Sequence, residues 1–71
     1  MSAPASAVAV EGNVTFEVDG LVTAVKRFDQ IPERATITTG PQGAVSLRFK
    51  SGSLIRLAGL TQIKLTELVH G

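Results

Sequence analysis

The sequence predicts an all-β domain, folded either as a small twisted β-sandwich or as a solenoid-like stack of short antiparallel hairpins, with about six strands. Three observations support this prediction. Apolar and polar residues alternate along most of the chain, as they do in half-buried strands. Turn-forming residues recur at a spacing of roughly ten residues. No segment of about ten residues or more shows the 3.6-residue apolar period, flanked by caps, that an amphipathic helix requires.

Length and composition limit the architecture to one small domain. The chain has 71 residues, no Cys and one His, so it contains neither a disulfide nor the ligands of a structural zinc site. A core of this size supplies only about 3–5 kcal/mol of net stability. We expect a single β-domain over residues 9–68, a disordered lead-in over residues 1–8 and a tail at residues 69–71. The small residues at positions 3–7 resemble the end of a signal peptide, but no complete signal peptide is expected.

The first candidate strand covers residues 9–18. Its inward-facing residues are Val14, Phe16 and Val18. Asp19-Gly20 follows directly and predicts a tight hairpin to a return strand at residues 21–25, because glycine accepts the positive φ of such a turn. Gly12-Asn13 interrupts the first strand, which predicts a bulge or a bend at that point.

A polar connection follows at residues 26–34. We expect Phe28 and Ile31 to anchor it against the core, whereas Pro32 excludes a central strand there because proline has no amide hydrogen. The β-branched residues at 35–39 predict a short strand.

The second half of the chain alternates most regularly. Its predicted inward-facing residues are Val45, Leu47, Phe49, Ile55, Leu57, Ile63 and Leu65. Its predicted turn residues are Gly40, Gly43, Gly52 and Ser53. A looser turn is expected at residues 58–61, and residues 66–71 either extend the last strand through Leu68 or fray. We expect the outward charges Lys26, Arg56 and Lys64 to protect sheet edges from unwanted pairing.

Nothing in the sequence predicts an enzyme, a cofactor site or a metal site. His70 is the second-to-last residue, where an ordered ligand or general base is not expected. The acidic residues form no metal-binding motif. Ser51 and Ser53 flank Gly52 without a base nearby, which indicates a turn rather than a nucleophile.

Charge and aromatic content argue against nucleic acid as a partner. The net charge is +1, Lys26-Arg27 is the only adjacent basic pair, and the chain has three Phe but no Trp or Tyr. Nucleic-acid binding requires clustered basic residues with aromatics for stacking. No apolar run approaches the roughly 20 residues of a membrane span, so direct membrane insertion is not expected.

The order of turn glycines and apolar pairs over residues 10–66 resembles a FecR-type domain. The resemblance begins at residues 11–14 and continues through residues 35–49 and 51–57. The positions that follow the family pattern include Thr39, Gly40, Gly43, Gly52, Ser53, Ile55, Leu57, Thr61, Ile63 and Leu65. The chain departs from the pattern at Ser51, where the family commonly has Asp, and at residues 28–31, where the family often has an Ala-Gly-Asp-like segment.

The resemblance implies a bacterial, periplasmic or otherwise extracytoplasmic location, as a fragment of a larger protein. In the regulators that name the family, the domain acts as a relay between an outer-membrane transport receptor and a membrane-bound sigma-factor regulator. The family pattern carries no catalytic residues. It therefore implies a non-catalytic interaction or structural module of a cell-surface signalling protein, with an envelope protein as its partner.

Alternatives remain open at this point. A protein-interaction module would add a partner strand to an exposed edge, at residues 21–25 or 62–68. A carbohydrate- or cell-wall-polymer-binding module would expose aromatics for stacking, but the pattern places two of the three Phe on inward faces. A homodimer is the hypothesis if the leucines outside the inward register form one patch. These are Leu21, Leu54, Leu60 and Leu68.

Overall fold

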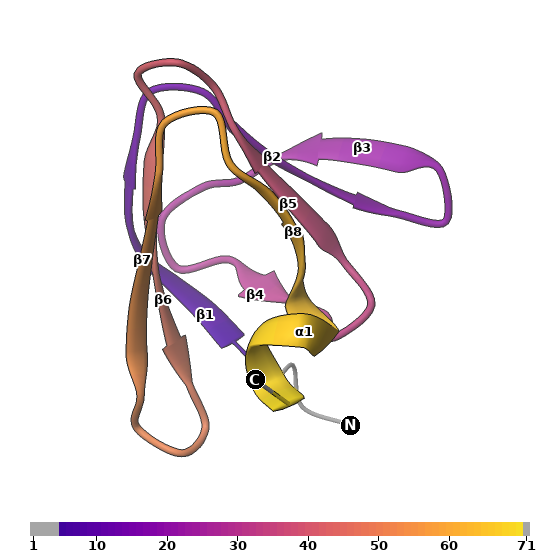
Figure 1. The fold of residues 1–71 in the computed structure, drawn as a ribbon, viewed down its shortest axis with the longest axis vertical. Helices are drawn as coiled ribbons and strands as arrows, with labels where there is room; N and C mark the ends of the chain where they lie inside the picture. The colour runs from indigo at the N-terminus through magenta and orange to yellow at the C-terminus, as the bar shows by residue number, and fades with distance from the viewer. Residues whose placement is uncertain (1–4, 71) are drawn as a thin grey trace.

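The computed structural model describes residues 5–70, apart from the side chains at positions 67, 69 and 70, and arranges them as two packed four-stranded antiparallel sheets (Figure 1). The strands of sheet A, in spatial order, are β4 (Gln30–Ile31), β1 (Ala5–Glu11), β6 (Ala44–Phe49) and β7 (Leu54–Ala58). Those of sheet B are β3 (Leu21–Ala24), β2 (Val14–Val18), β5 (Thr36–Thr39) and β8 (Gln62–Lys64). The predicted all-β class is confirmed, and the sandwich is the form observed.

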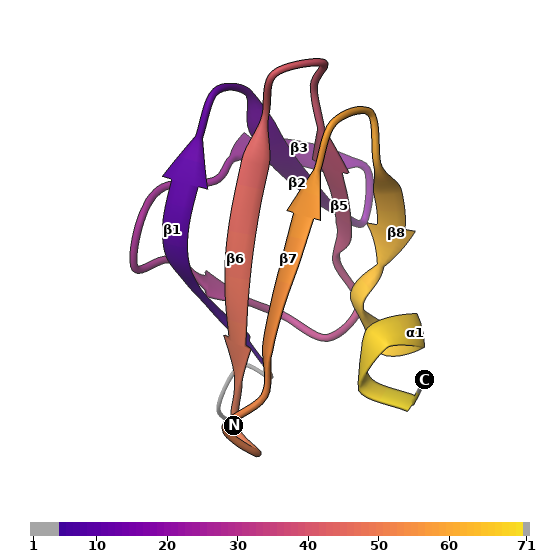
Figure 2. The ribbon, with the colours of Figure 1, turned by 60° about the vertical axis from the view of Figure 1, so that its left-hand side comes forward.

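The sandwich is a three-stranded ribbon folded over on itself. β1 continues into β2, β5 into β6 and β7 into β8, and each of these passages moves the chain from one sheet to the other. Figure 2 shows the three passages side by side at one end of the molecule. Strands β4 and β3 are then added at one edge of each sheet.

The core lies between the sheets and is filled by the alternating residues of both. Val45, Leu47 and Phe49 of β6 are buried, whereas Arg48 is exposed, as the alternation predicts. Ile37 of β5 is fully buried on the facing sheet. The remaining core residues include Ala5, Ala7, Val14, Val25, Ile31, Ala35, Leu57 and Leu65.

The end where the ribbon folds is held by backbone hydrogen bonds between the three passages, and we call it the fold corner (residues 12–13, 40–43 and 58–61). The amide of Gly40 donates to the carbonyl of Asn13 at 2.8 Å. The amides of Gly59 and Leu60 donate to the carbonyls of Gly43 and Gly40 at 3.0 and 3.1 Å. These bonds satisfy backbone groups that the break in strand pairing would otherwise leave open.

Glycine is required at the fold corner because two backbones approach too closely for a side chain. A Cβ at Gly12 would lie 2.6 Å from the carbonyl oxygen of Gln42, and a Cβ at Gly43 would overlap the carbonyl oxygen of Asn13. Gly12 also has a φ of +63°, in the left-handed region. The bend predicted at Gly12-Asn13 is therefore the point at which the chain leaves sheet A for sheet B.

A buried threonine ties the third passage to the second. Thr39 is the one polar residue among the buried residues that the structure describes, with 1% of its surface exposed. Its Oγ1 accepts the amide hydrogen of Thr61 at 3.0 Å, and its own amide donates to the Thr61 carbonyl at 2.8 Å. The buried Thr39 hydroxyl is therefore hydrogen-bonded to the backbone of the β7–β8 loop, and no polar atom of this side chain is left without a partner.

Two strands differ from the sequence-based prediction. The strand expected over residues 9–18 is two strands, β1 and β2, because the fold corner divides it between the sheets. Gln30–Ile31 forms the short strand β4 inside the connection that was expected to be irregular, and it pairs with Ser6 and Ala5. The described chain therefore contains eight strands rather than about six.

The predicted ends of the domain are also corrected. A disordered lead-in over residues 1–8 is wrong for residues 5–8, which belong to β1, with Ala5 and Ala7 buried. Residues 1–4 lie outside the described residues. The last strand ends at Lys64, and residues 65–70 form the short helix α1 rather than a strand extension or a frayed tail; Gly71 lies outside the described residues.

The helix follows from the three-residue spacing of Leu65 and Leu68. Leu65 is fully buried and Leu68 packs against the core, so one helical face meets the sandwich. A helix this short is stabilised by such packing rather than by its own propensity. No helix in the described part of the chain has the length and apolar character needed to cross a membrane.

The close backbone contact at the fold corner can be tested by substituting Gly43, with Gly20 as a control outside the corner. Gly43→Ala is expected to lower the free energy of unfolding by about 2–3 kcal/mol, because the new methyl group meets backbone that cannot move aside. The control is Gly20→Ala, because a Cβ at this position meets nothing within 4 Å. Its free energy of unfolding is expected to fall by only about 1 kcal/mol, the cost of a Cβ at a φ of +83°. Urea unfolding followed by circular dichroism measures both, since the chain has no Trp or Tyr. Equal losses would contradict the steric role of the corner.

Candidate interaction site at edge strand β3

The predicted turn residue pair Asp19-Gly20 lies in the two-residue loop between β2 and β3. Both residues have positive φ, 52° and 83°, which is the conformation of a type I′ hairpin turn. Val18 pairs with Leu21 across the loop. This turn twists the two strands as a right-handed pair, so it fixes the direction in which β3 leaves the sandwich.

The other predicted turn residues lie at two places. Gly40 and Gly43 lie in the passage from β5 to β6 at the fold corner. Gly52, with a φ of 96°, and Ser53 lie in the hairpin between β6 and β7. There the Ser53 carbonyl accepts the Phe49 amide at 2.9 Å, and its amide donates to the Ser51 hydroxyl at 3.4 Å.

Strand β3 is the most exposed strand of the described structure. All four of its residues are exposed, with Leu21 at 71% and Val22 at 60%. It pairs with β2 on one side, and no described strand pairs with its other side. Figure 1 shows the β2–β3 hairpin reaching away from the rest of the sandwich. Both faces and one edge of β3 are therefore open to a binding partner.

The hydrogen-bond pattern shows which backbone groups of β3 point outward. The amide of Val25 donates to the carbonyl of Val14 at 2.9 Å, so this pair is a hydrogen-bonded pair of the antiparallel ladder. Such pairs alternate with non-bonded ones, which makes Thr23 and Leu21 the next bonded residues toward the turn. The amide and carbonyl groups of Val22 and Ala24 therefore point away from β2, along the open edge.

The other three edges are protected. Strand β7 carries Arg56, whose Nη2 lies 3.4 Å from Glu11 Oε1, and β8 is three residues long and carries Lys64. Strand β4 is two residues long and is followed by Pro32. Charges, proline and short length are the usual means of preventing edge pairing. Two of the three expected edge-protecting charges thus lie on edge strands, whereas Lys26 lies beyond the end of β3.

Charged residues border β3 at its two ends. Asp19 precedes it and forms an ion pair with Arg34, with 2.7 Å between Oδ2 and Nη2. Both side chains are about 70% exposed, so this pair contributes little stability. Lys26 and Arg27 follow the strand, and β3 itself contains no charged residue. The edge is uncharged, with an acidic and a basic end.

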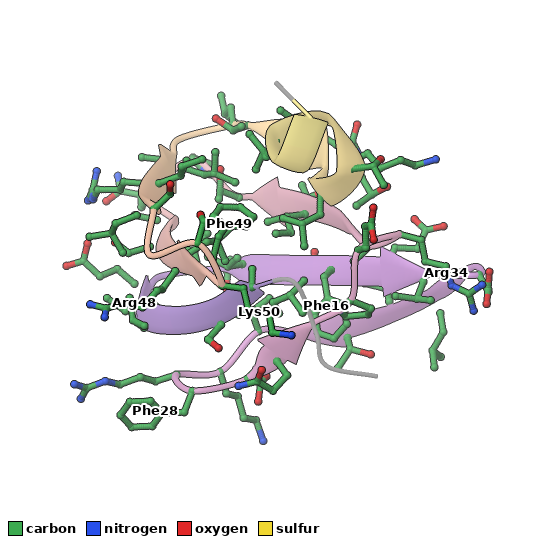
Figure 3. The ribbon with its side chains drawn as sticks, turned by 90° about the horizontal axis from the view of Figure 1, so that it is seen from below. Phe16, Phe28, Arg34, Arg48, Phe49 and Lys50 are labelled. Carbon is green, nitrogen blue, oxygen red and sulfur yellow. The ribbon has the colours of Figure 1, made fainter. Side chains whose placement is uncertain are left out.

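Phe28 is a second exposed feature. It was expected to anchor the connection, and this is wrong: the side chain is 67% exposed, and the fully buried Ile31 is the anchor. Figure 3 shows the ring of Phe28 outside the ribbon, whereas Phe49 lies between the sheets. The guanidinium of Arg27 lies 4.7 Å from the centre of the Phe28 ring, in cation–π contact.

The backbone of Phe28 is strained. Its φ is 76°, which is costly for a bulky residue, while its amide donates to the Ala7 carbonyl at 2.6 Å. The sequence offers no signal for this conformation, because Gly or Asn would be the expected residue type. Strain of this kind is concentrated at binding and catalytic sites, and it prompts the hypothesis that the exposed ring has a use.

The acidic residues are dispersed by the fold. Glu11 contacts Arg56, Asp19 contacts Arg34, and the carboxylate of Asp29 accepts the Lys26 amide at 2.8 Å. Among the residues that the structure describes, no three His, Cys, Asp or Glu side chains are grouped as a metal site would require. The side chain of His70 lies outside the description.

The leucines outside the inward register do not form one patch. Leu21 begins β3 in the projecting hairpin, and Leu54 begins β7 beside the β6–β7 turn. Leu60 lies in the fold corner, where its amide donates to the Gly40 carbonyl at 3.1 Å. Leu68 packs against the core. The four leucines therefore do not favour a homodimer, which stays a prediction from the sequence.

Comparison of the chain with protein-family models, curated proteins and solved structures gives no match. The resemblance to FecR-type domains therefore stays a prediction from the sequence pattern.

The strain at Phe28 can be measured with two substitutions. Phe28→Ala keeps a residue with a Cβ at positive φ, whereas Phe28→Gly removes this penalty. The glycine variant is expected to be more stable than the alanine variant by about 1 kcal/mol in urea unfolding. At most positions the order is the reverse, because glycine usually lowers the stability of the folded chain relative to alanine. If Phe28→Ala were as stable as Phe28→Gly or more stable, the backbone at position 28 would not be strained.

Proposed function

We propose that this chain is a non-catalytic protein-interaction module of the bacterial cell envelope that binds an extended segment of a partner protein as an additional strand beside β3. The observation that carries the proposal is that β3 alone, among the edges of the described sheets, lacks charge and proline and is long enough to pair. The ladder groups of Val22 and Ala24 supply donors and acceptors for the partner backbone.

The exposed side chains of β3 define the chemistry of the partner segment. Because Leu21 and Val22 lie on opposite faces of the strand, the added segment needs apolar or β-branched residues on both of its faces. A charge in the middle of the segment would be placed beside these apolar side chains. The preferred segment is therefore extended, about four or five residues long and uncharged at its centre.

The cellular setting of the proposal comes from the resemblance to FecR-type domains. It supports an extracytoplasmic location and a place in a cell-surface signalling regulator, in which the module relays contact from a receptor to a membrane-bound regulator. In this setting the domain is one part of a larger protein, and the strand is supplied by an envelope protein.

A cell-wall polymer is the second candidate partner, and Phe28 favours it. An exposed aromatic ring beside a guanidinium can stack on a sugar ring and contact a carboxylate or phosphate. We place this candidate second because Phe16 and Phe49 pack on the core side, leaving a single aromatic for stacking.

The proposal is tested by capture from solubilised cell envelope with three forms of the domain. The wild type is compared with Val22→Lys, which puts a charge on the open edge, and with Leu54→Lys, a matched control on β7 whose parent residue is also 60% exposed. An envelope protein whose capture falls about tenfold or more with Val22→Lys and is unchanged with Leu54→Lys would support strand addition.

Three other results would count against strand addition at β3. Equal loss with both lysine variants would indicate a general effect of surface charge. Retention of glycan-containing material that is lost with Phe28→Ala would favour the polymer-binding alternative. Binding of nucleic acid would contradict the proposed partner class.

A further inference from the structure

We infer that β3 also pairs with the β3 strand of a second copy of this chain, antiparallel and centred on Thr23. The inference rests on the proposed function in one respect, because both use the open edge of β3. Homodimers favour twofold symmetry, and an antiparallel strand pair has such an axis at its centre. The symmetry of β3 itself then determines the register.

The outward backbone groups are arranged symmetrically about Thr23. Val22 and Ala24 are the residues whose amide and carbonyl groups face the open edge, one on either side of Thr23. A twofold axis at Thr23 places Val22 of one copy opposite Ala24 of the other. Each such pair exchanges two N–H···O bonds, as in any hydrogen-bonded antiparallel pair. In an antiparallel register centred on Val22 or on Ala24 instead, only one of these two residues would lie opposite an outward-facing residue of β3.

Side chains are compatible with this register. The two copies of Thr23 face each other in a non-bonded pair, where side chains approach most closely and Thr–Thr pairs are favourable. Leu21 and Val22, exposed by 71% and 60%, gain apolar neighbours from the second copy. No charged residue lies within β3, so none is brought into the centre of the contact.

Charge at the ends of the strand selects the antiparallel direction. Asp19 precedes β3, and Lys26-Arg27 follows it. Antiparallel pairing brings the acidic end of one copy toward the basic end of the other, whereas parallel pairing would bring like charges together. These charges are exposed, so the dimer is expected to weaken as salt is added.

The hairpin can accept a second copy without rearrangement. It projects from the sandwich, and the ladder to β2 is complete on its inner side (Figure 1). Four residues from each copy make a small contact, so we expect a weak, concentration-dependent dimer rather than an obligate one. In such a dimer each copy covers the edge of the other until a partner strand displaces it.

Cysteine cross-linking tests the register, because the chain has no cysteine of its own. Thr23→Cys places two thiols across the twofold axis, at a separation that suits a disulfide. Val22→Cys is the matched control: it is exposed on the same strand, but in this register it lies opposite Ala24, and the two Val22 positions are too far apart to bridge. Under mild oxidation, Thr23→Cys is expected to form disulfide-linked dimer about tenfold faster.

A proline variant provides an independent readout. Ala24→Pro removes an amide hydrogen that points outward and leaves the ladder to β2 intact. In the Thr23→Cys background it is expected to slow cross-linking about tenfold. Equal cross-linking of Thr23→Cys and Val22→Cys, or cross-linking indifferent to Ala24→Pro, would overturn the inference. A wild-type chain that sediments as a monomer at about 100 µM would also overturn the inference. The dissociation constant of the dimer would then lie far above this concentration, which is too weak for a specific contact.

Failure of this inference is distinguishable from failure of the proposed function. A monomeric chain whose capture of an envelope protein still depends on Val22 overturns the dimer and leaves the function standing. A dimeric chain with Thr23-dependent cross-linking, whose capture is indifferent to Val22→Lys, supports the dimer and overturns the function.

Discussion

The close approach of two backbones at Gly12 and Gly43 is the constraint on which the rest of this structure depends. A three-stranded ribbon can fold onto itself only if all of its strands bend at the same level, and here the three bends touch and exchange hydrogen bonds. Thr39 then fixes the third bend to the second. Once the corner is formed, the inward residues of both halves face each other, and the core follows from the alternation.

The open edge of β3 is a consequence of this arrangement. The segments β1–β2, β5–β6 and β7–β8 each contribute one strand to each sheet, so the two halves of each segment face each other across the core. Strands β3 and β4 each belong to one sheet only. At the corresponding edges, β3 has four residues and β4 has two. The projecting part of β3 therefore has no strand to pack against.

Patterns that act over a few residues were predictable from the sequence, and contacts over long separations were not. The inward set of β6 and the Asp19-Gly20 hairpin follow from local rules. The role of Gly12 depends on Gln42, which no local pattern connects to it. Ala5 and Ala7 are too small to mark a strand, although both are buried. Residues 21–25 were one of the two edges expected to be open. Choosing between these two edges required knowing on which strands Arg56 and Lys64 lie.

A chain of 71 residues without cysteine has little stability to spare, so features that lower its stability or promote aggregation are informative. An unprotected edge invites aggregation, and a bulky residue at positive φ lowers stability. The chain retains both while protecting every other edge, which argues that β3 is kept open for binding. An added strand would extend sheet B without disturbing the ladder between β3 and β2. A partner segment that binds only the folded chain would add its binding free energy to a small folding free energy. The proposed partner strand would thus couple the stability of the domain to the occupancy of its open edge.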